Sequence, residues 1–378
     1  MQILKTISIA SLAIALASPA MAEVKFSGFG SLVAGQTLED DEKLTADFYD
    51  VGQYENTTTF KAESVLGLQV TADIATDLKA TGQLLAKGTD EFKPELDWYY
   101  LTYQAADDWT LMAGRRNIPM YYYSEFSEVG YAYPWIRPPS NLYWWQVTQF
   151  DGFHASYDFS TENYTNSVTA FYGNEYSDDN KEMLYYAEIG NRQLNGASIV
   201  RVDEYWTDIA GFNVNIIGES FDMRMVYFQN DRKRIDTNVN GETAVRASAS
   251  GFSQQFFGVG GNVNIDNLTI IYDANYVAYD DDVGTVFPTY LISTVYNIGQ
   301  YQPYLSYSKA DHWQTKSDNE KNYEEHYMAS IGVRYNLSSK ASAKFQFDHF
   351  EDEGEGGPDG WAYHGNSQTF SAGVDFIF

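Results

Sequence analysis

Residues 341–348 read Ala341-Ser342-Ala343-Lys344-Phe345-Gln346-Phe347-Asp348, and this stretch decides the fold class of the chain. Its odd positions are apolar and its even positions are polar. Because successive side chains of a β-strand point to opposite faces, a strand formed here has one apolar and one polar face. The same alternation runs through 66–73, 212–216, 331–336 and the final residues 372–378. Strands of about ten residues with this pattern are typical of proteins that cross a membrane as a β-barrel.

Working outward from these segments, we place about sixteen strands along the chain. They start near residues 24, 60, 78, 95, 109, 149, 165, 206, 221, 253, 268, 285, 301, 324, 340 and 367. Short turns alternate with long polar segments, the latter at 35–59, 117–148, 175–205, 230–252 and 351–366. An even count lets the first and last strands pair and leaves no free edge. The sequence therefore predicts an all-β fold, a transmembrane antiparallel up-and-down β-barrel. A soluble sandwich or propeller is the alternative, but its strands would be about five to six residues long.

The amino terminus has the composition of a cleaved secretory signal peptide. Lys5 supplies a positive start, residues 7–17 form an apolar core, and Ala20-Met21-Ala22 is a small-residue cleavage site. We expect residues 1–22 to be removed and residues 23–378 to form one barrel domain. No later run of about 18 or more apolar residues follows, so the sequence contains no candidate helical membrane span.

Composition excludes several classes of function. The chain has 31 Tyr, 23 Phe and no Cys, with a net charge of −28. Such an acidic chain does not suit nucleic acid, because binding phosphates requires clustered Lys and Arg. Without cysteine, thiol catalysis and cysteine-ligated metals are excluded. The five histidines show no metalloprotease spacing and no pairing with a motif serine. The sequence therefore predicts no enzyme, no cofactor and no metal.

Three features together resemble the Gram-negative trimeric porin family. They are the opening Val24-Lys25-Phe26-Ser27-Gly28-Phe29-Gly30, the ending Val374-Asp375-Phe376-Ile377-Phe378, and a long third loop. The resemblance covers essentially all of the chain after residue 22. It implies an outer-membrane homotrimer with a water-filled channel for passive diffusion of small polar solutes and ions. It also implies contact with outer-membrane lipid and lipopolysaccharide, and recognition of Phe378 by the barrel-assembly machinery.

A sixteen-stranded barrel is too wide to be filled by its own side chains, so something must narrow it. The resemblance implies that segment 117–148 folds into the lumen as a constricting third loop; a position on the barrel rim or on a neighbouring subunit is the alternative. Its acidic pair, Glu125 and Glu128, would then face the lumen. Strand phase supplies an opposing basic wall: Lys25, Lys61, Lys79, Arg334 and Lys344, with Arg116 at the base of the loop. Acidic and basic sides facing each other would make a transverse field that filters ions.

Ion preference and solute preference stay open at this point. The strong negative charge favours cations, and charge reversal at Lys61 or Arg334 should shift selectivity further toward them. The loop aromatics Tyr121, Tyr122, Tyr123 and Trp135 suggest a second possibility, a substrate-specific channel for oligosaccharides or organic acids. Packing of these rings against the barrel wall is the simpler interpretation. A structural or adhesive barrel without a pore is the third possibility.

Overall fold

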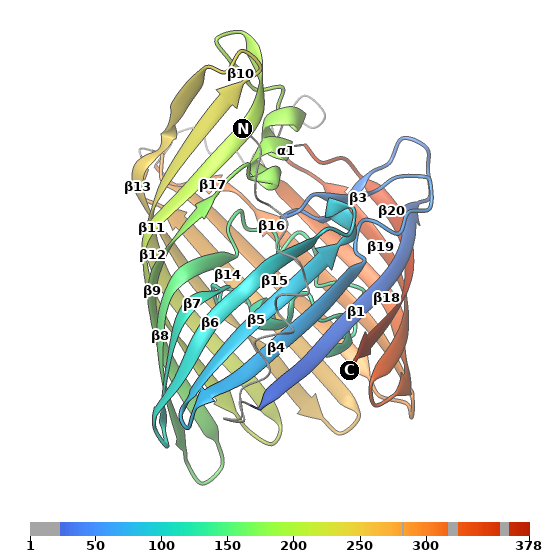
Figure 1. Cartoon of the computed structure of the whole chain (residues 1–378). Coiled ribbons are helices and arrows are strands. Elements are labelled where there is room, and N and C mark those ends of the chain that lie inside the picture. Colours follow the sequence, from blue (N-terminus) through green and yellow to red (C-terminus); the bar gives the residue numbers. More distant parts are fainter. Residues whose placement is uncertain (1–22, 282, 317–323, 356–362) are drawn as a thin grey trace.

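The computed structural model describes residues 23–281, 283–316, 324–355 and 363–378, so the predicted signal peptide lies outside the described residues. Within these ranges sixteen long strands form a closed antiparallel barrel (Figure 1). The strands are β1 (Val24–Thr37), β4 (Val65–Ala75), β5 (Leu78–Lys87), β6 (Pro94–Ala106), β7 (Trp109–Asn117), β8 (Gln149–Ser160), β9 (Thr165–Ser177), β11 (Ala197–Ile217), β12 (Phe221–Asn238), β13 (Thr243–Ile265), β14 (Leu268–Tyr279), β15 (Thr285–Tyr296), β16 (Tyr301–Asp311), β18 (Glu325–Ser338), β19 (Ala341–Asp352) and β20 (Ser367–Ile377). The predicted fold class is confirmed.

The barrel closes between its first and last strands. Strand β1 pairs with β20 from Phe29↔Ile377 to Thr37↔Thr369, and its other edge pairs with β4. Gly28 and Phe378 exchange two backbone hydrogen bonds of 3.0 and 2.9 Å. Both edges of β1 are therefore paired, as a sheet exposed to lipid requires.

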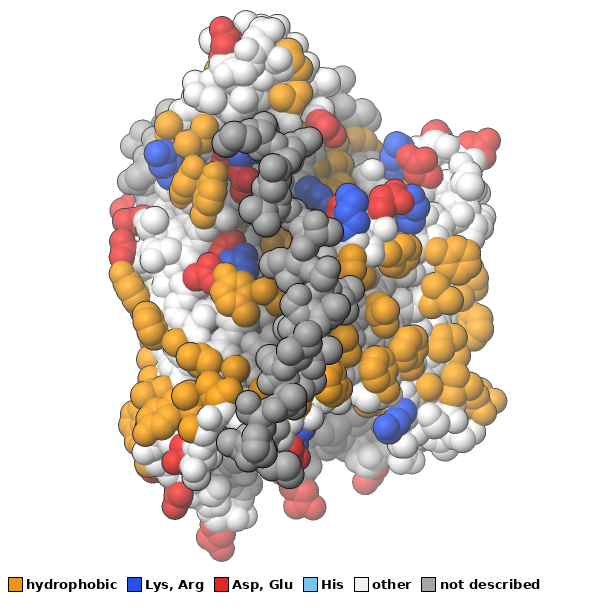
Figure 2. Space-filling view, in the orientation of Figure 1, with side chains coloured by type: hydrophobic (Ala, Val, Ile, Leu, Met, Phe, Trp, Pro, Cys, Tyr) orange, Lys and Arg blue, Asp and Glu red, His pale blue; other side chains and the backbone are white. Residues whose placement is uncertain are grey.

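Side chains alternate between the outside and the lumen as the sequence pattern predicts. On β19 Phe345 is 49% exposed on the outer face, whereas Lys344 and Gln346 are buried on the inner face. Figure 2 shows hydrophobic side chains gathered over the outer face of the strands, with charged side chains mostly above and below them. An apolar band bounded by polar ends is the surface that a lipid bilayer covers. None of the helices in the described ranges is long and apolar enough to cross a membrane.

Eight connections lie at the end of the barrel opposite the short turns, and we number them L1 to L8. They comprise residues 38–64, 88–93, 118–148, 178–196, 239–242, 280–284, 312–324 and 353–366, of which 282, 317–323 and 356–362 lie outside the described residues. L1 contains the hairpin β2 (Leu44–Asp47) and β3 (Gly52–Tyr54), and L4 contains helix α1 (Lys181–Ile189) and β10 (Gln193–Leu194). L7 contains the short strand β17 (Trp313–Gln314).

Three predicted strand starts and one predicted loop are wrong, and β4 begins at Val65 rather than near 60. Strand β11 begins at Ala197 rather than near 206, and β13 begins at Thr243 rather than near 253. The segment 230–252, predicted to be a long loop, is mostly strand, and L5 spans only residues 239–242. Strands β11–β13 rise beyond the rest of the barrel (Figure 1), where no lipid selects for an apolar outer face. The alternation that marks a membrane strand is therefore absent there.

Candidate pore constriction

L3 enters the lumen and crosses it. It leaves β7 at Ile118, which is fully buried, and forms two short 3-10 turns, η3 (Ser124–Phe126) and η4 (Gly130–Ala132). The backbone N–H of Tyr122 donates to Asp273 Oδ2 on β14 at 3.0 Å. Farther along, Asn141 Nδ2 donates to the backbone oxygen of Ser308 on β16 at 3.2 Å. Since β14 and β16 lie across the barrel from β7, the loop spans the lumen between them.

Two of the predicted wall cations hold L3 in place. Lys344 Nζ donates to the backbone oxygens of Gly130 and Trp135, both at 2.5 Å, and pairs with Asp375 at 2.9 Å. Arg334 donates to the backbone oxygen of Tyr131 at 2.8 Å. Because Lys344 is fully buried beneath the loop, its charge is taken up by these contacts rather than presented to solvent.

Two cavities of the lumen border L3. The cavity on the loop side has a volume of about 320 Å³ and is bordered by L1, L2, L3, helix α1 and the ends of β5–β8. The cavity on the turn side has about 180 Å³ and is bordered by β1, β4–β7, β20 and L3. Four residues line both cavities: Asp97, Asn117, Ser127 and Glu128. These four side chains lie where the two cavities meet, and we call them the constriction.

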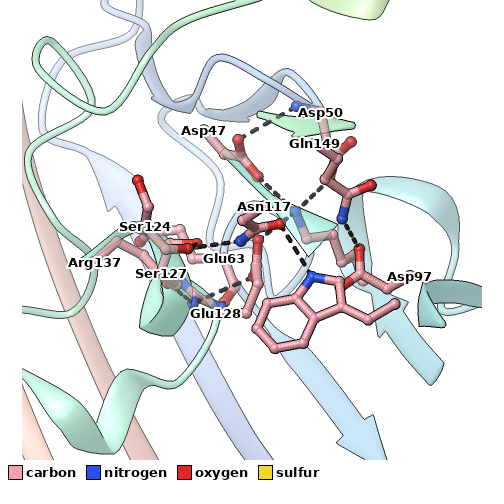
Figure 3. Close-up of polar contacts among 12 residues, drawn as sticks. Asp47, Asp50, Glu63, Asp97, Asn117, Ser124, Ser127, Glu128, Arg137 and Gln149 are labelled. Carbon is pink, nitrogen blue, oxygen red and sulfur yellow. Dashed lines mark hydrogen bonds and ion pairs between the residues drawn. The ribbon is translucent and has the colours of Figure 1, made fainter. Parts of the chain in front are cut away.

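Ion pairs organise the charges around the constriction (Figure 3). Lys87, at the end of β5, lies 2.7 Å from Glu128 Oε1 and also contacts Asp50 and Asp47 of L1. Arg137, from the second half of L3, lies 3.5 Å from the other oxygen of Glu128. Burial opposes ionisation of Glu128, but the charges of Lys87 and Arg137 outweigh it and hold its pKa below the ordinary value. Glu128 is therefore a carboxylate at neutral pH.

Glu125 has a different set of partners. Arg224, which points inward from β12, lies 2.8 Å from Glu125, and Arg116 at the end of β7 lies 3.5 Å from it. Burial acts to raise its pKa, and the charges of these two arginines lower it below the ordinary value. Both carboxylates of the predicted acidic pair therefore lie against basic side chains, Glu128 at the constriction and Glu125 beside the turn-side cavity.

The structure does not bring the remaining predicted wall lysines to L3. Lys25 and Lys79 lie near the turn end of the barrel, where they pair with Glu23 and Asp73. Strand β4 begins at Val65 rather than near residue 60, so Lys61 precedes it in L1. The Lys61 side chain is 56% exposed and pairs with Glu91 of L2. A role for these three residues in ion selection stays a prediction.

The loop aromatics pack mostly against one another and the barrel wall. Trp135 is fully buried, and its Nε1 donates to Ser306 Oγ on β16 at 2.5 Å. Tyr123 lies between Tyr122 and Trp135, with ring centroids 4.9 and 5.8 Å away. Tyr121 borders the loop-side cavity but is buried, with 5% exposure. Packing against the barrel wall explains the position of Trp135. Contact of the three tyrosines with a solute stays a prediction.

Sequence reasoning missed most of the charged residues at the constriction or the cavity above it, among them Asp97, Lys87, Asp47, Asp50 and Arg137. Lys87 had a usable signal, because it shares the inward phase of β5 with Lys79. Asp47 and Asp50 of L1 had no such signal, because the sequence of a polar segment does not indicate whether it folds into the lumen or away from it. Arg137 sits within L3 itself, so the loop carries basic as well as acidic charge.

A closed barrel with an apolar belt, a polar lumen and an inward loop that narrows it defines a membrane channel. The sequence model of Gram-negative porins matches residues 8–355, and the chain belongs to this family. It is therefore an outer-membrane porin, a channel for passive diffusion. Among curated proteins none matches the chain.

Solved structures agree at the level of the fold. The chain is similar to the trimer form of in-vitro folded OmpT, an outer membrane protein of Vibrio cholerae, with 13% identity, coverage of 94% of this chain and 99% of that chain, and a TM-score of 0.56. It is similar to Salmonella typhi OmpF in complex with daunomycin, with 14% identity, coverage of 94% and 98%, and a TM-score of 0.57. It is also similar to an anion-selective porin from Comamonas acidovorans, with 16% identity, coverage of 95% and 100%, and a TM-score of 0.53.

Proposed function

We propose that diffusing solutes pass between L3 and the walls of β5–β7 and that this path favours small cations. The observation that carries the proposal is the composition of the constriction. Its four residues include two carboxylates, Asp97 and Glu128, and no basic side chain. Because Lys87 and Arg137 pair with Glu128, the charge that no ion pair among the described residues offsets is that of Asp97. Asp97 accepts a hydrogen bond from the neutral amide of Gln149, so that contact leaves its charge uncancelled. A fixed negative charge at the narrowest point of a pore attracts cations and repels anions.

The wider surroundings support the same preference. The loop-side cavity is bordered by six acidic side chains and five basic ones, Asp47, Asp50, Asp90, Glu95, Asp97 and Glu128 against Lys87, Lys93, Arg115, Arg137 and Lys181. The chain as a whole has a net charge of −28. Cations are therefore concentrated near the mouth before they reach the constriction. The Comamonas neighbour is described as anion-selective, but selectivity follows from local charge rather than from the fold.

Single-channel recording in a KCl gradient tests this function. The refolded protein should give discrete conductance steps and a reversal potential of the sign that marks cation preference. Asp97→Asn, which keeps the side-chain shape, should move that potential toward zero. Asp107→Asn, in the exposed turn between β6 and β7, is the matched control and should leave it unchanged. Anion preference in the parent protein, or equal effects of both variants, would contradict the proposal.

We also propose a homotrimer embedded in outer-membrane lipid and lipopolysaccharide, with no catalytic step. The trimer form of the Vibrio cholerae neighbour and the family support the trimer. Phe378, 56% exposed at the turn end, is the group we propose the barrel-assembly machinery recognises. Sedimentation in detergent tests the assembly: a mass of three chains supports it, and a mass of one contradicts it. Deletion of Phe378 should reduce insertion into the outer membrane without altering refolding in detergent.

A further inference from the structure

Three of the five histidines gather inside the loop end of the barrel, away from the constriction. His326 lies near the start of β18, His364 lies in L8, and His312 begins L7. Donor atoms of Glu324, His326 and His364 all lie within 4.8 Å of one another. We call these three residues the histidine cluster. The side chains of Glu324 and His364 are only 3% and 2% exposed, and His326 is fully buried.

His326 is the most unusual member of the cluster. Both of its ring nitrogens are buried, and neither has a hydrogen-bond partner among the described residues. A buried polar atom is normally satisfied, because leaving it without a partner costs free energy. The ring lies 5.3 Å from the ring of His364 and is flanked by Phe350 and Trp144. A neutral imidazole in an apolar surround with a free lone pair is a common metal ligand.

His364 is oriented by a second residue. Its Nδ1 lies 3.1 Å from the hydroxyl of Tyr185 on α1, while its Nε2 lies 3.5 Å from Glu324 Oε1. In the tautomer that carries the proton on Nδ1, His364 donates to Tyr185 and turns its Nε2 lone pair toward Glu324. Metal-binding histidines are usually held in this way through their other nitrogen.

Negative charge surrounds the cluster. Glu182 on α1 is fully buried, and neither of its carboxylate oxygens has a hydrogen-bond partner among the described residues. The nearby Arg232 is already paired with Glu204 at 2.7 Å. A divalent cation bound by Glu324 would place a positive charge in this region, where the Glu182 oxygens have no hydrogen-bond partner among the described residues.

A mostly acidic surface lies beside the cluster. A cavity at the loop end is lined by Glu39, Asp41, Glu42 and Lys43 of L1 and by residues 363–366, which include His364. Carboxylates at the mouth of such a cavity raise the local concentration of cations. His364 therefore belongs both to this surface and to the cluster, although its side chain is only 2% exposed.

We propose that Glu324, His326 and His364 bind one Zn²⁺ per chain. Two imidazole nitrogens and one carboxylate oxygen form a donor set that suits Zn²⁺, whereas Ca²⁺ and Mg²⁺ prefer oxygen ligands alone. The fourth position is open to water or to His312, whose Nδ1 lies 3.9 Å from Glu324 Oε2. Because the three ligands come from L7, β18 and L8, the bound ion ties two loops to the barrel wall.

The test measures Zn²⁺ uptake by the refolded full-length protein, with Zn²⁺ alone as the probe. We expect one ion per chain after gel filtration, and no retention of Ca²⁺ or Mg²⁺. Glu324→Gln and the double variant His326→Gln/His364→Gln should weaken binding by more than about 100-fold, because loss of an outer-shell partner alone costs about 10–100-fold. Tyr185→Phe, which removes only the orienting hydroxyl, should weaken it by about tenfold.

His349→Gln is the matched control. His349 lies on the neighbouring strand β19 with its side chain 43% exposed and paired with Glu351, and its loss should leave one Zn²⁺ per chain. Heat-modifiable migration on gels confirms that each variant forms the barrel. X-ray absorption of the loaded protein should show histidine nitrogen ligands. A parent protein that takes up no more Zn²⁺ than the double variant, or Glu324→Gln binding as tightly as the parent, would overturn the proposal.

Discussion

Lys87 Nζ lies 2.7 Å from Glu128 Oε1, so the end of strand β5 contacts L3 directly. The same ammonium contacts Asp50 and Asp47, which reach it from L1. Three segments far apart in the sequence therefore meet at one cation beside the constriction. The charges around the loop-side cavity nearly balance because of this arrangement. Substitution of any one of these residues should therefore change the net charge of the cavity.

Lys87→Gln should make the channel more selective for cations. The substitution leaves Asp47, Asp50 and Glu128 without the ammonium that they share. One unit charge acts on an ion at about 4 Å with roughly 1 kcal/mol in water, equivalent to about a fivefold change in occupancy. The K⁺ over Cl⁻ permeability ratio, taken from reversal potentials, should rise by up to this factor.

Lys61→Gln is the control for that experiment, because the sequence pattern assigned Lys61, and not Lys87, to the predicted basic wall. Its side chain is largely exposed in L1 and pairs with Glu91, not with L3. We expect a smaller shift of the reversal potential than for Lys87→Gln. If the two variants shift it equally, charge at the constriction does not dominate selectivity.

Lys344→Met should loosen L3. The change removes the hydrogen bonds to Gly130 and Trp135 and leaves Asp375 buried without its cation. Breaking a buried ion pair from one side typically costs about 3–5 kcal/mol. Denaturant unfolding in micelles should show a loss of this order, and open-channel noise should increase.

Because Asp375 also accepts from Ser31 at 2.6 Å, the double variant Lys344→Met/Asp375→Asn should recover part of the stability. Equal stability of the single and double variants would show that the unpaired charge of Asp375 does not cause the loss of stability in Lys344→Met.

Cation preference should rise with pH between about 5 and 7. Burial raises the pKa of Asp47 from 3.8 to about 6, and Lys87 only partly offsets this effect. As pH rises through that value, Asp47 ionises and adds a negative charge to the loop-side cavity. Folding raises this pKa, so between pH of about 4 and 6 the folded protein keeps a proton that the unfolded chain loses, and the free energy of unfolding falls as pH rises across that interval.

Reversal potentials recorded across this pH range provide the measurement. Asp47→Asn should flatten the pH dependence, whereas Asp107→Asn in the exposed turn should preserve it. A profile that is unchanged in Asp47→Asn would assign the titration to another group.

The barrel could be predicted from sequence because lipid imposes a strict pattern on every strand that it touches. Phe345, Lys344 and Phe376 were assigned to their faces from phase alone, and the structure agrees. The outer parts of β11 and β13 were missed for the complementary reason. Above the membrane, strand pairing rests on backbone hydrogen bonds, which leave no such alternation in the sequence.

The constriction was less predictable than the barrel. Length and aromatic content marked L3 as an inward loop, and Glu125 and Glu128 do meet basic residues there. The alternation along a strand predicts which face a side chain occupies but not its height along the barrel axis. Lys25 and Lys79 were therefore grouped with L3, which they do not reach. Contacts between loops, such as Lys87 with Asp50, depend on tertiary folding that no local pattern records.

Thiol modification at Ser127 tests the central claim most directly. Ser127 is one of the four residues common to both cavities, and the chain has no cysteine, so Ser127→Cys would carry a single thiol. A charged methanethiosulfonate reagent should lower single-channel conductance in discrete steps, while Ser339→Cys, in the exposed turn after β18, should conduct as before. Unchanged conductance after complete modification of the Ser127→Cys thiol would show that ions do not pass between L3 and the β5–β7 wall.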